Sequence, residues 1–570
     1  MSTMVTSPSP VRGQRFEGTS LVAMLQCRAT VQPTDRAFTY LEDGEREAAA
    51  FTWHELDQRA RAVAAWLQSR VQPGDRALLL YPPGIDFIAG FFGCLYAGAI
   101  AVPAMPPQRG RAQRGLDRVQ AIVRSAEPKV VLTAGEIAPP APPSWLTSIP
   151  VLRTESIDLE WAARWSPGPA GPSLAFLQYT SGSTATPKGV MVSHANLLAN
   201  LTYGYSAGES NDQTVSVSWL PVTHDMGLIE GVLQPAFSGT PAYLMSPAAF
   251  LQRPLRWLSA IASLRATRSG GPNFAYELAA TRIAPHERAR LDLSCWQAAY
   301  NGAEPVRHDT MRAFADAFRE AGFDAAAFRP CYGLAEATLL VSSDRWDGRV
   351  SGAHVSCGAP AGGTLLEIVD PTTGVQSRAG ELGEILVSGP GVAGGYWNDP
   401  AETNRVFVTD AHSGRGWLHT GDLGFVAGDR LYVTGRLKDL LIVRGTKHFP
   451  QDLERTAERL HPDIRRGGVT AVAAASGVRG DHVVVIAETD PRVIREGAST
   501  SLMAAIREAV AEAHGIQLHA IALVSPGSVP RTTSGKPRRY LCRDAWLHRT
   551  LEPLAEWREE APVIAAIGAE

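Results

Sequence analysis

The 570-residue sequence contains few cysteines and almost no net charge, and each of these absences excludes classes of function. Its six cysteines are widely scattered, and no pair has the close spacing of a zinc site or a redox motif. We therefore expect a cytoplasmic, reducing setting without a disulfide framework. The formal net charge of −3 provides no strong field to recruit nucleic acid or anionic lipid. Residues 1–17 lack the apolar core of a secretory signal, and we expect a flexible tail there.

Long apolar runs are also scarce, with one exception at residues 87–105, which carry no charge over a near membrane-spanning length. Glycine and proline interrupt this run, and Asp86 lies just before it. We expect a buried helix over 86–96, a stop at Gly98 and a core strand over 99–102. A membrane span is the alternative interpretation.

The remaining composition is that of a globular protein, with 45% hydrophobic and 19% charged residues, and the length favours several domains. Strand-like apolar runs alternate with helical patterns, which predicts an α/β fold with largely parallel, buried sheets. A turn signal at 370–374 lies between strand-like runs and indicates a small antiparallel β subdomain. We expect an N-terminal domain over 18–437 and a small α+β domain over 438–570.

The most informative segment runs from Thr180 to Gly189 and packs five hydroxyl side chains, two glycines and one lysine into ten residues. Glycine lets backbone N–H groups converge on an anion, hydroxyls add donors, and Lys188 adds positive charge. These features favour a phosphate chain as the ligand. The residues assigned to phosphate binding are Thr180, Ser181, Gly182, Ser183, Thr184 and Lys188.

The flanks of this loop differ from those of the common nucleotide-triphosphatase loop, which needs Gly-Lys-Ser/Thr followed by a helix. A strand-like run at 174–179 precedes the loop, a short β-branched run at 190–192 follows it, and Ser193 is a candidate N-cap for a later helix. A strand–loop–strand phosphate cradle is thus predicted. A plain Ser/Thr/Gly surface loop is the alternative.

Further signals follow the loop in order: Asn-Gly-Ala-Glu-Pro at 301–305, Tyr-Gly-Leu-Ala-Glu at 332–336, His-Thr-Gly-Asp at 419–422, Gly-Arg at 435–436 with Lys-Asp at 438–439, and Thr-Thr-Ser-Gly-Lys at 532–536. This series resembles the signatures of the adenylate-forming, acyl-CoA synthetase-like superfamily over roughly residues 20–545. The stretches at 219–229, 269–277, 333–338 and 449–454 resemble those of fatty acyl-AMP ligases within that superfamily.

The resemblance implies two parallel-rich α/β sheets, a small antiparallel subdomain and a small mobile C-terminal domain that turns about Lys438. It also implies that ATP and Mg²⁺ activate a fatty acid as its acyl adenylate, with pyrophosphate leaving. The acyl group then passes to the phosphopantetheine thiol of an acyl carrier protein, or of a carrier domain of a polyketide or nonribosomal peptide synthase. We expect neither a nucleic-acid partner nor a membrane span for such an enzyme.

Each candidate site residue has a task in that reaction and a plainer structural alternative. Lys536 would bridge the acyl carboxylate and the α-phosphate, or lie in a solvated basic patch. His224 would lie near the same two groups, or be a structural histidine. Glu336, supported by Thr184, would bind Mg²⁺, or lie on a helix face.

The nucleotide would be held by an aromatic and polar set of residues. Tyr332 would cover the adenine with Gly302 and Ala303 as the opposite wall, and Asp422 would accept hydrogen bonds from the ribose hydroxyls. The alternatives are a core tyrosine and a turn cap. The full nucleotide set also includes Glu304, Gly333 and Arg436. The acyl chain would contact Met226, Ile229, Leu233, Phe274 and Tyr276, each of which could equally be ordinary core.

The sequence departs from the family pattern at two places, of which the first removes one phosphate-binding hydroxyl and the second concerns the acceptor. Ala335 precedes Glu336 where many relatives carry Thr, and only 21 residues separate Glu336 from Gly358, where most fatty acyl-AMP ligases carry an extra segment. That segment is linked to the refusal of coenzyme A. A fatty acyl-CoA ligase is therefore the first alternative, and a non-catalytic nucleotide-binding module is an alternative of another class.

Overall fold

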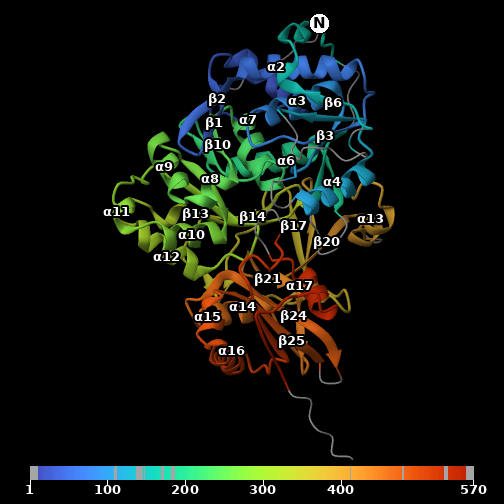
Figure 1. Cartoon of the computed structure of the whole chain (residues 1–570). Helices are drawn as coiled ribbons and strands as arrows, with labels where there is room; N and C mark the ends of the chain where they lie inside the picture. The colour runs from blue at the N-terminus through green and yellow to red at the C-terminus, as the bar shows by residue number, and fades with distance from the viewer. Residues whose placement is uncertain are drawn as a thin grey trace, which may run out of the picture. The chain divides into compact units, whose positions relative to one another are not determined.

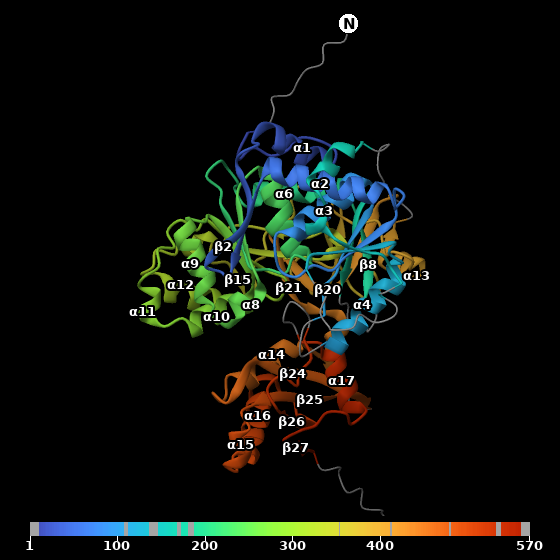
Figure 2. The same cartoon turned by 45° about the horizontal axis from the view of Figure 1, so that its top comes forward.

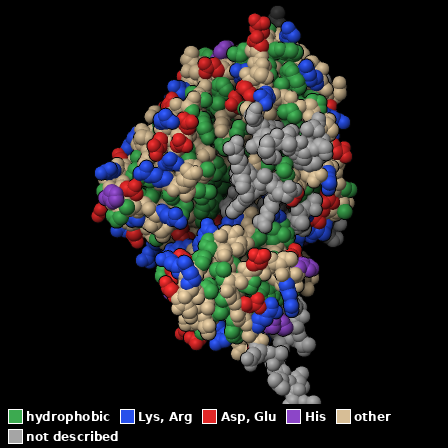
Figure 3. Space-filling view, viewed as in Figure 1, with side chains coloured by type: hydrophobic (Ala, Val, Ile, Leu, Met, Phe, Trp, Pro, Cys, Tyr) green, Lys and Arg blue, Asp and Glu red, His purple; other side chains and the backbone are tan. Residues whose placement is uncertain are grey.

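The computed structural model describes residues 11–107, 112–135, 146, 148–167, 173–180, 187–352, 354–410, 413–477, 480–531 and 537–559. The chain forms two compact units, residues 1–433 and 434–570 (Figures 1 and 2), so the division falls slightly before the predicted start of the second domain at 438. On the face drawn in Figure 3, acidic and basic side chains are interspersed, in keeping with the small net charge.

The first unit contains an eight-stranded sheet with the strand order β14-β13-β12-β11-β9-β10-β1-β2. Its six inner strands run parallel, and the edge strands β2 and β14 are antiparallel to their neighbours. The strands are β1 (Arg36–Glu42), β2 (Arg46–Thr52), β9 (Ser216–Ser218), β10 (Ala242–Met245), β11 (Arg268–Pro272), β12 (Ala298–Gly302), β13 (Phe328–Gly333) and β14 (Leu340–Ser343).

A second, six-stranded sheet has the order β6-β5-β3-β4-β7-β8 and is parallel apart from the antiparallel pair β7–β8. Its strands are β3 (Arg76–Leu79), β4 (Ile100–Pro103), β5 (Val130–Thr133), β6 (Val151–Arg153), β7 (Leu174–Thr180) and β8 (Lys188–Ser193). The predicted α/β fold with two parallel-rich sheets is therefore confirmed.

Helices cover both sheets and bury most of the apolar surface of the first unit. Helix α6 contacts β8 of one sheet and β14 of the other, and α2 lies against α3 in both views (Figures 1 and 2). The helices are α1 (Leu21–Val31), α2 (Trp53–Gln68), α3 (Asp86–Ala97), α4 (Ala112–Ala126), α6 (His194–Ala207), the π-helix η3 (Met226–Leu233), α7 (Gln234–Ser238), α8 (Pro247–Gln252), α9 (Leu255–Leu264), α10 (Asn273–Arg282), α11 (Pro285–Arg288), α12 (His308–Phe318) and α13 (Pro400–Val406).

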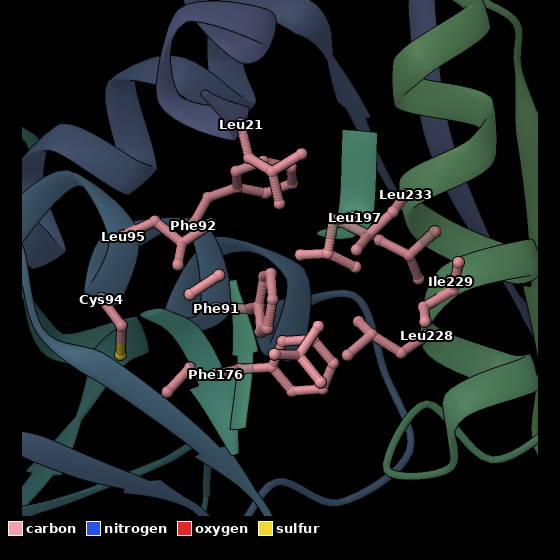
Figure 4. Close-up of a cluster of buried hydrophobic side chains, with 14 of the residues drawn as sticks. Leu21, Phe91, Phe92, Cys94, Leu95, Phe176, Leu197, Leu228, Ile229 and Leu233 are labelled. Carbon is pink, nitrogen blue, oxygen red and sulfur yellow. The ribbon is translucent and has the colours of Figure 1, made fainter. Parts of the chain in front are cut away.

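The apolar run at 87–105 forms part of the core, as predicted. Helix α3 ends at Gly98, which has the left-handed φ of 75°, and β4 follows. Phe91 of α3 packs edge-on against Phe176 of β7 with ring centroids 5.8 Å apart. Figure 4 shows these rings meeting side chains from α1, α6 and η3. In the described part of the chain, we find no helix with both the length and the apolar character needed to cross a membrane.

A smaller antiparallel sheet of the first unit has the order β17-β18-β20-β19, and β21, which pairs with β20, runs across the division between residues 433 and 434. The predicted turn at 370–374 is present directly after β17. The Asp370 carboxylate stabilises this turn by accepting the N–H groups of Thr372 and Thr373. The strands are β17 (Leu365–Val369), β18 (Gly383–Ser388), β19 (Phe407–Thr409), β20 (Gly416–Ala427) and β21 (Arg430–Arg436), and a separate hairpin pairs β15 (Val350–Ser351) with β16 (His354–Val355).

The second unit has a six-stranded sheet in the order β23-β22-β25-β26-β27, with β24 paired to β25. Its strands are β22 (Leu441–Val443), β23 (Thr446–His448), β24 (Ile464–Gly477), β25 (Gly480–Thr489), β26 (Ala520–Val524) and β27 (Ala555–Arg558). Helices α14 (Pro450–Glu458), α15 (Arg492–Arg495), α16 (Ser499–His514) and α17 (Arg539–Leu547) complete it. Its separate apolar core is centred on the buried Leu453, Val485 and Ile506.

Candidate active site

The predicted strand–loop–strand arrangement is present around the phosphate loop. Strands β7 and β8 pair antiparallel, and Thr180 lies opposite Lys188, so the two ends of the loop are fixed one strand spacing apart. Ser193 then caps α6 in a reciprocal capping box with Asn196. The predicted phosphate ligands Ser181, Gly182, Ser183 and Thr184 lie outside the described residues.

Lys188 has two partners that the sequence did not indicate. Its ammonium group forms an ion pair with the carboxylate of Glu402 on α13 and lies 5.3 Å from the ring centroid of Tyr396. Arg405 donates two hydrogen bonds to the same carboxylate, at 2.7 and 2.6 Å. The Arg405 hydrogen bonds, together with Lys188, lower the pKa of Glu402 to about 2. Lys188 is thus held between an anion and an aromatic face.

Glu336 lies in the short 3₁₀ turn η5 (Ala335–Ala337), and its carboxylate accepts a hydrogen bond of 2.8 Å from the Tyr396 hydroxyl. Burial and the Glu336 charge raise the pKa of Tyr396, so this hydroxyl stays protonated and donates. Tyr396 therefore touches both Lys188 and Glu336. Its side chain connects the phosphate loop to the predicted metal ligand.

The residues predicted for adenine and ribose also meet. The Tyr332 hydroxyl at the end of β13 donates to Asp422 Oδ2 of β20 at 2.9 Å, and both residues are buried. Asp422 donates its own N–H to Thr420 Oγ1 at 3.1 Å. One position earlier, the N–H of Gly421 donates to Glu384 at 2.9 Å. The side chains of Glu384 and Thr420 therefore hold the backbone at Gly421 and Asp422.

Glu384 is a second buried carboxylate of this region. Burial opposes its charge, but hydrogen bonds from His419 and from the Gly421 N–H outweigh that cost and hold the pKa of Glu384 below its usual range. Glu384 is thus an anion that orients the turn carrying Asp422.

Close packing of the backbone explains the small residues among those predicted to bind the nucleotide. A Cβ at Gly302 would lie 2.5 Å from Cys331 Sγ, and one at Gly333 would lie 1.6 Å from the Leu339 carbonyl oxygen. Ala303 has the left-handed φ of 64°. Glu304 accepts the N–H of Phe274 at 2.7 Å, which satisfies a free donor at the start of α10. Gly333 and Glu304 therefore have structural roles regardless of any ligand.

His224 lies between β9 and the π-helix η3 and is paired with its neighbour. Its Nδ1 lies 2.5 Å from Asp225 Oδ1, which also accepts the Met226 N–H at 2.7 Å. The preceding Thr223 carbonyl accepts a hydrogen bond of 3.1 Å from Gln178 of β7. The His224 segment is therefore linked to the strand that leads into the phosphate loop. Asp225 orients the histidine ring, a role that sequence reasoning missed.

The residues predicted to line the acyl site fall into two core clusters. Ile229 and Leu233 of the π-helix η3 belong to one cluster, and Met226 and Tyr276 belong to the other, with Phe274 packed against it. Tyr276 is fully buried, donates to the Tyr300 carbonyl at 2.8 Å, and packs edge-on against several aromatic rings. Tyr276 thus has the features of an ordinary core residue, which is the alternative to a contact with the acyl chain.

The remaining predicted residues belong to the second unit. Arg436 ends β21, Lys438 lies in the 3₁₀ turn η6 (Leu437–Asp439), and both side chains are exposed. Lys536 lies outside the described residues. The described residues on either side of it, Arg531 and Pro537, form an antiparallel bridge.

The start of α17 is anchored by charge. Arg539 donates two hydrogen bonds of 2.7 Å to the buried Glu454 and one of 2.8 Å to Asp439, which lies in η6. Burial opposes the Arg539 charge, but the two carboxylates outweigh it and raise the pKa of Arg539. Within this unit, the turn that contains Lys438 and the start of α17 therefore share one ionic cluster.

Two family models match the chain, one in each unit. Residues 25–397 match the AMP-binding enzyme family, and residues 438–556 match the AMP domain of the Disco-interacting protein 2-like family. The first match alone covers more than half of the chain.

Individual relatives match almost the whole length. The medium-chain-fatty-acid–[acyl-carrier-protein] ligase JamA of Moorena producens is 40% identical, over 97% of this chain and 99% of that protein. FadD21 of Mycobacterium tuberculosis, which is named provisionally as a fatty-acid–CoA ligase, is 37% identical over 92% of this chain and 97% of that protein.

A solved structure supports the same family assignment. The fatty acyl-adenylate ligase from L. pneumophila, determined in complex with acyl adenylate and pyrophosphate, is 41% identical and superimposes with a TM-score of 0.71. The similarity covers 95% of this chain and 98% of that one. The chain belongs to the AMP-binding enzyme family and, within it, to the fatty acyl-AMP ligases.

Proposed function

We propose that this enzyme uses ATP and Mg²⁺ to convert a fatty acid into its acyl adenylate, and then transfers the acyl group to the phosphopantetheine thiol of an acyl carrier protein. The observation that carries the proposal is the hydrogen bond from Tyr332 to Asp422. It joins the predicted purine-binding residue to the predicted ribose-binding residue, although they lie 90 positions apart.

Adenylation begins when the fatty acid carboxylate attacks the α-phosphate of ATP and pyrophosphate leaves. Two anions must approach each other, so most of the catalysis comes from positioning and charge neutralisation. Lys188 and the hydroxyls of the loop hold the β- and γ-phosphates. Lys536 brings a compact positive charge to the carboxylate and the α-phosphate, and His224 lies near the same two groups.

Mg²⁺ is a hard cation that takes one or two carboxylates and completes its shell with phosphate oxygens and water. Glu336 fits this requirement because it is a partly exposed carboxylate whose position is fixed by Tyr396. The described residues contain no group of three or more metal-ligating side chains, so phosphate and water would supply the other ligands. When bound, Mg²⁺ neutralises phosphate charge and favours pyrophosphate as a leaving group.

Transfer to the thiol follows in a second arrangement of the C-terminal unit, reached by rotation about Lys438. Arg436 and Lys536 of that unit serve the adenylation arrangement. The carrier's phosphopantetheine arm brings no adenosine phosphate, so it avoids any block against the nucleotide part of coenzyme A.

ATP–pyrophosphate exchange dependent on a fatty acid tests the adenylation step. We expect exchange in the wild-type enzyme, and a non-catalytic nucleotide-binding module would give none. A series of saturated fatty acids in the same assay identifies the preferred chain length.

The acceptor is tested by chromatography of a labelled fatty acid after incubation with ATP, Mg²⁺ and either coenzyme A or a holo-acyl carrier protein. We expect labelled carrier protein, and acyl adenylate that persists with coenzyme A. Acyl-CoA formed at the rate of adenylation would establish the fatty acyl-CoA ligase instead, and would show that the short segment after Glu336 decides the acceptor.

A further inference from the structure

Three segments that are far apart in the sequence meet at the side chain of Tyr396. Its hydroxyl donates to the Glu336 carboxylate at 2.8 Å, while the Lys188 ammonium lies 5.3 Å from the centre of its ring. One aromatic side chain thus touches a predicted metal ligand with its polar end and a predicted phosphate ligand with its apolar face.

The backbone holds Tyr396 firmly in this place. Tyr396 forms an antiparallel bridge with Val190 of β8, and its N–H donates to Thr403 Oγ1 at 2.9 Å. On either side, the Met191 N–H donates to the Gly395 carbonyl at 2.9 Å and the Trp397 N–H donates to the Gly189 carbonyl at 2.7 Å. The ring therefore moves together with the strand that begins at Lys188.

Glu336 is fixed to the same segment by its main chain, because its carbonyl accepts the N–H of Ala393 at 2.9 Å. The side-chain hydrogen bond then sets the direction of the carboxylate. Glu402 contributes from the other side by pairing with Lys188. Tyr396 thus contacts both the carboxylate and the ammonium group, while Ala393 and Glu402 each hold one of the two residues.

We propose that Tyr396 is a positioning residue that sets Glu336 for Mg²⁺ with its hydroxyl and Lys188 for the nucleotide phosphates with its ring. This inference rests on the proposed function, since it assumes that Glu336 serves the metal. A hydrogen bond to a metal-ligating carboxylate orients the ligand, and its removal costs about 10- to 100-fold in metal affinity. One substitution can therefore remove the hydroxyl alone, and another can remove the hydroxyl together with the ring.

The test measures ATP binding by calorimetry without fatty acid, so that no turnover occurs, at a series of Mg²⁺ concentrations and in EDTA. Tyr396→Phe removes the hydroxyl and keeps the ring. We expect it to raise, by about 10-fold, the Mg²⁺ concentration at which the Mg²⁺-dependent increase in ATP affinity is half complete. The affinity for ATP without metal should be unchanged. Tyr396→Leu removes the ring as well, and we expect metal-free ATP affinity to fall by roughly 3- to 10-fold.

Glu336→Gln and the double variant Glu336→Gln/Tyr396→Phe show whether the hydroxyl acts through the carboxylate. Residues that act as one unit have non-additive effects, so the double variant should need no more Mg²⁺ than Glu336→Gln alone. Tyr81→Phe is the matched control. It removes another buried phenol hydrogen bond of the same unit, to Thr154 at 3.1 Å, and should leave the Mg²⁺ series unchanged.

The outcomes separate the inference from the function on which it rests. If Glu336→Gln shifts the Mg²⁺ series and Tyr396→Phe leaves it unchanged, the role of Tyr396 is overturned and the metal role of Glu336 stands. If Glu336→Gln itself causes no shift, the assigned metal ligand is wrong, and the inference falls with it. Additive effects in the double variant would show that the hydroxyl acts independently of Glu336.

Discussion

The Tyr332 hydroxyl donates a hydrogen bond of 2.9 Å to Asp422, so the predicted purine-binding and ribose-binding residues form one buried pair. This bond also fixes the tyrosine ring relative to the Asp422 carboxylate. Loss of either partner should therefore affect the same ligand.

We expect Asp422→Ala to raise the KM for ATP by about 10- to 100-fold, since hydrogen bonds to a charged group contribute roughly 1.5–3 kcal/mol each. Tyr332→Phe keeps the ring and should cost less. Because the two residues act together, the double variant Asp422→Ala/Tyr332→Phe should resemble Asp422→Ala. Initial rates of pyrophosphate exchange over an ATP series measure this, and additive effects would contradict the pairing.

Lys536→Ala should reduce adenylate formation by about 10²–10³-fold, because one electrostatic donor to the developing charge is lost. Transfer from preformed acyl adenylate to the carrier protein should change little. Lys447→Ala is the control, since Lys447 is an exposed lysine of the same unit. Single-turnover assays of each half-reaction distinguish the steps, and an equal loss in both would refute the assigned role.

Gly333→Ala should destabilise the first unit by roughly 1–3 kcal/mol or more, because the new methyl group would meet a backbone oxygen that cannot move aside. Gly416→Ala at the start of β20 is a suitable comparison. Its site is exposed, and no heavy atom lies within 4 Å of a Cβ built there. Thermal unfolding of both variants checks this, and equal melting temperatures would show that Gly333 is not required by packing.

His194 predicts a dependence of stability on pH. Its Nδ1 accepts the Leu21 N–H at 3.4 Å, and burial lowers the pKa of His194 below its usual value of 6.5. As the pH falls below 6.5, the unfolded chain binds a proton that the folded chain does not, so stability is lost. Between pH 6.5 and 5, His194→Gln should reduce the slope of the free energy of unfolding against pH by at most about 1.4 kcal/mol per pH unit. Urea unfolding of both proteins across this range measures it, and parallel curves would contradict it.

Arg539→Met should destabilise the second unit by roughly 3–5 kcal/mol, because Glu454 would remain as a buried charge without its ionic partner. Arg492→Met removes a surface partner of Asp490 and should cost less than about 1 kcal/mol. Hydrogen exchange of peptides from α14 and α17 resolves the local effect. Equal protection in the two variants would show that the buried pair contributes no net stability.

The local parts of the fold were predictable because their signals lie within a few residues. The apolar run before Thr180, the short β-branched run after Lys188 and the cap at Ser193 gave the strands and the helix around the phosphate loop. Likewise, the glycine at 98 predicted the boundary between a core helix and a core strand, and the structure has both.

The contacts that complete the site were not predictable, because they join distant positions. Lys188 and Glu402 lie 214 positions apart, and Tyr396 and Glu336 lie 60 apart. Neither Tyr396 nor Glu402 has a local pattern that distinguishes it from a core tyrosine or a first-turn glutamate of a helix. Only the pairing of the 394–397 segment with β8 brings these residues to the loop.

The π-helix η3 (Met226–Leu233) was also beyond sequence reasoning, because its run is apolar apart from Glu230 and does not distinguish wide turns from those of an α-helix. Its wider turns hold one residue more than an α-helix would need over the same rise. Deleting a single residue there would restore α-helical turns and leave the side chains that follow in their present directions. A change of one residue in the length of this segment would thus be absorbed within it, without moving the elements that follow in the chain.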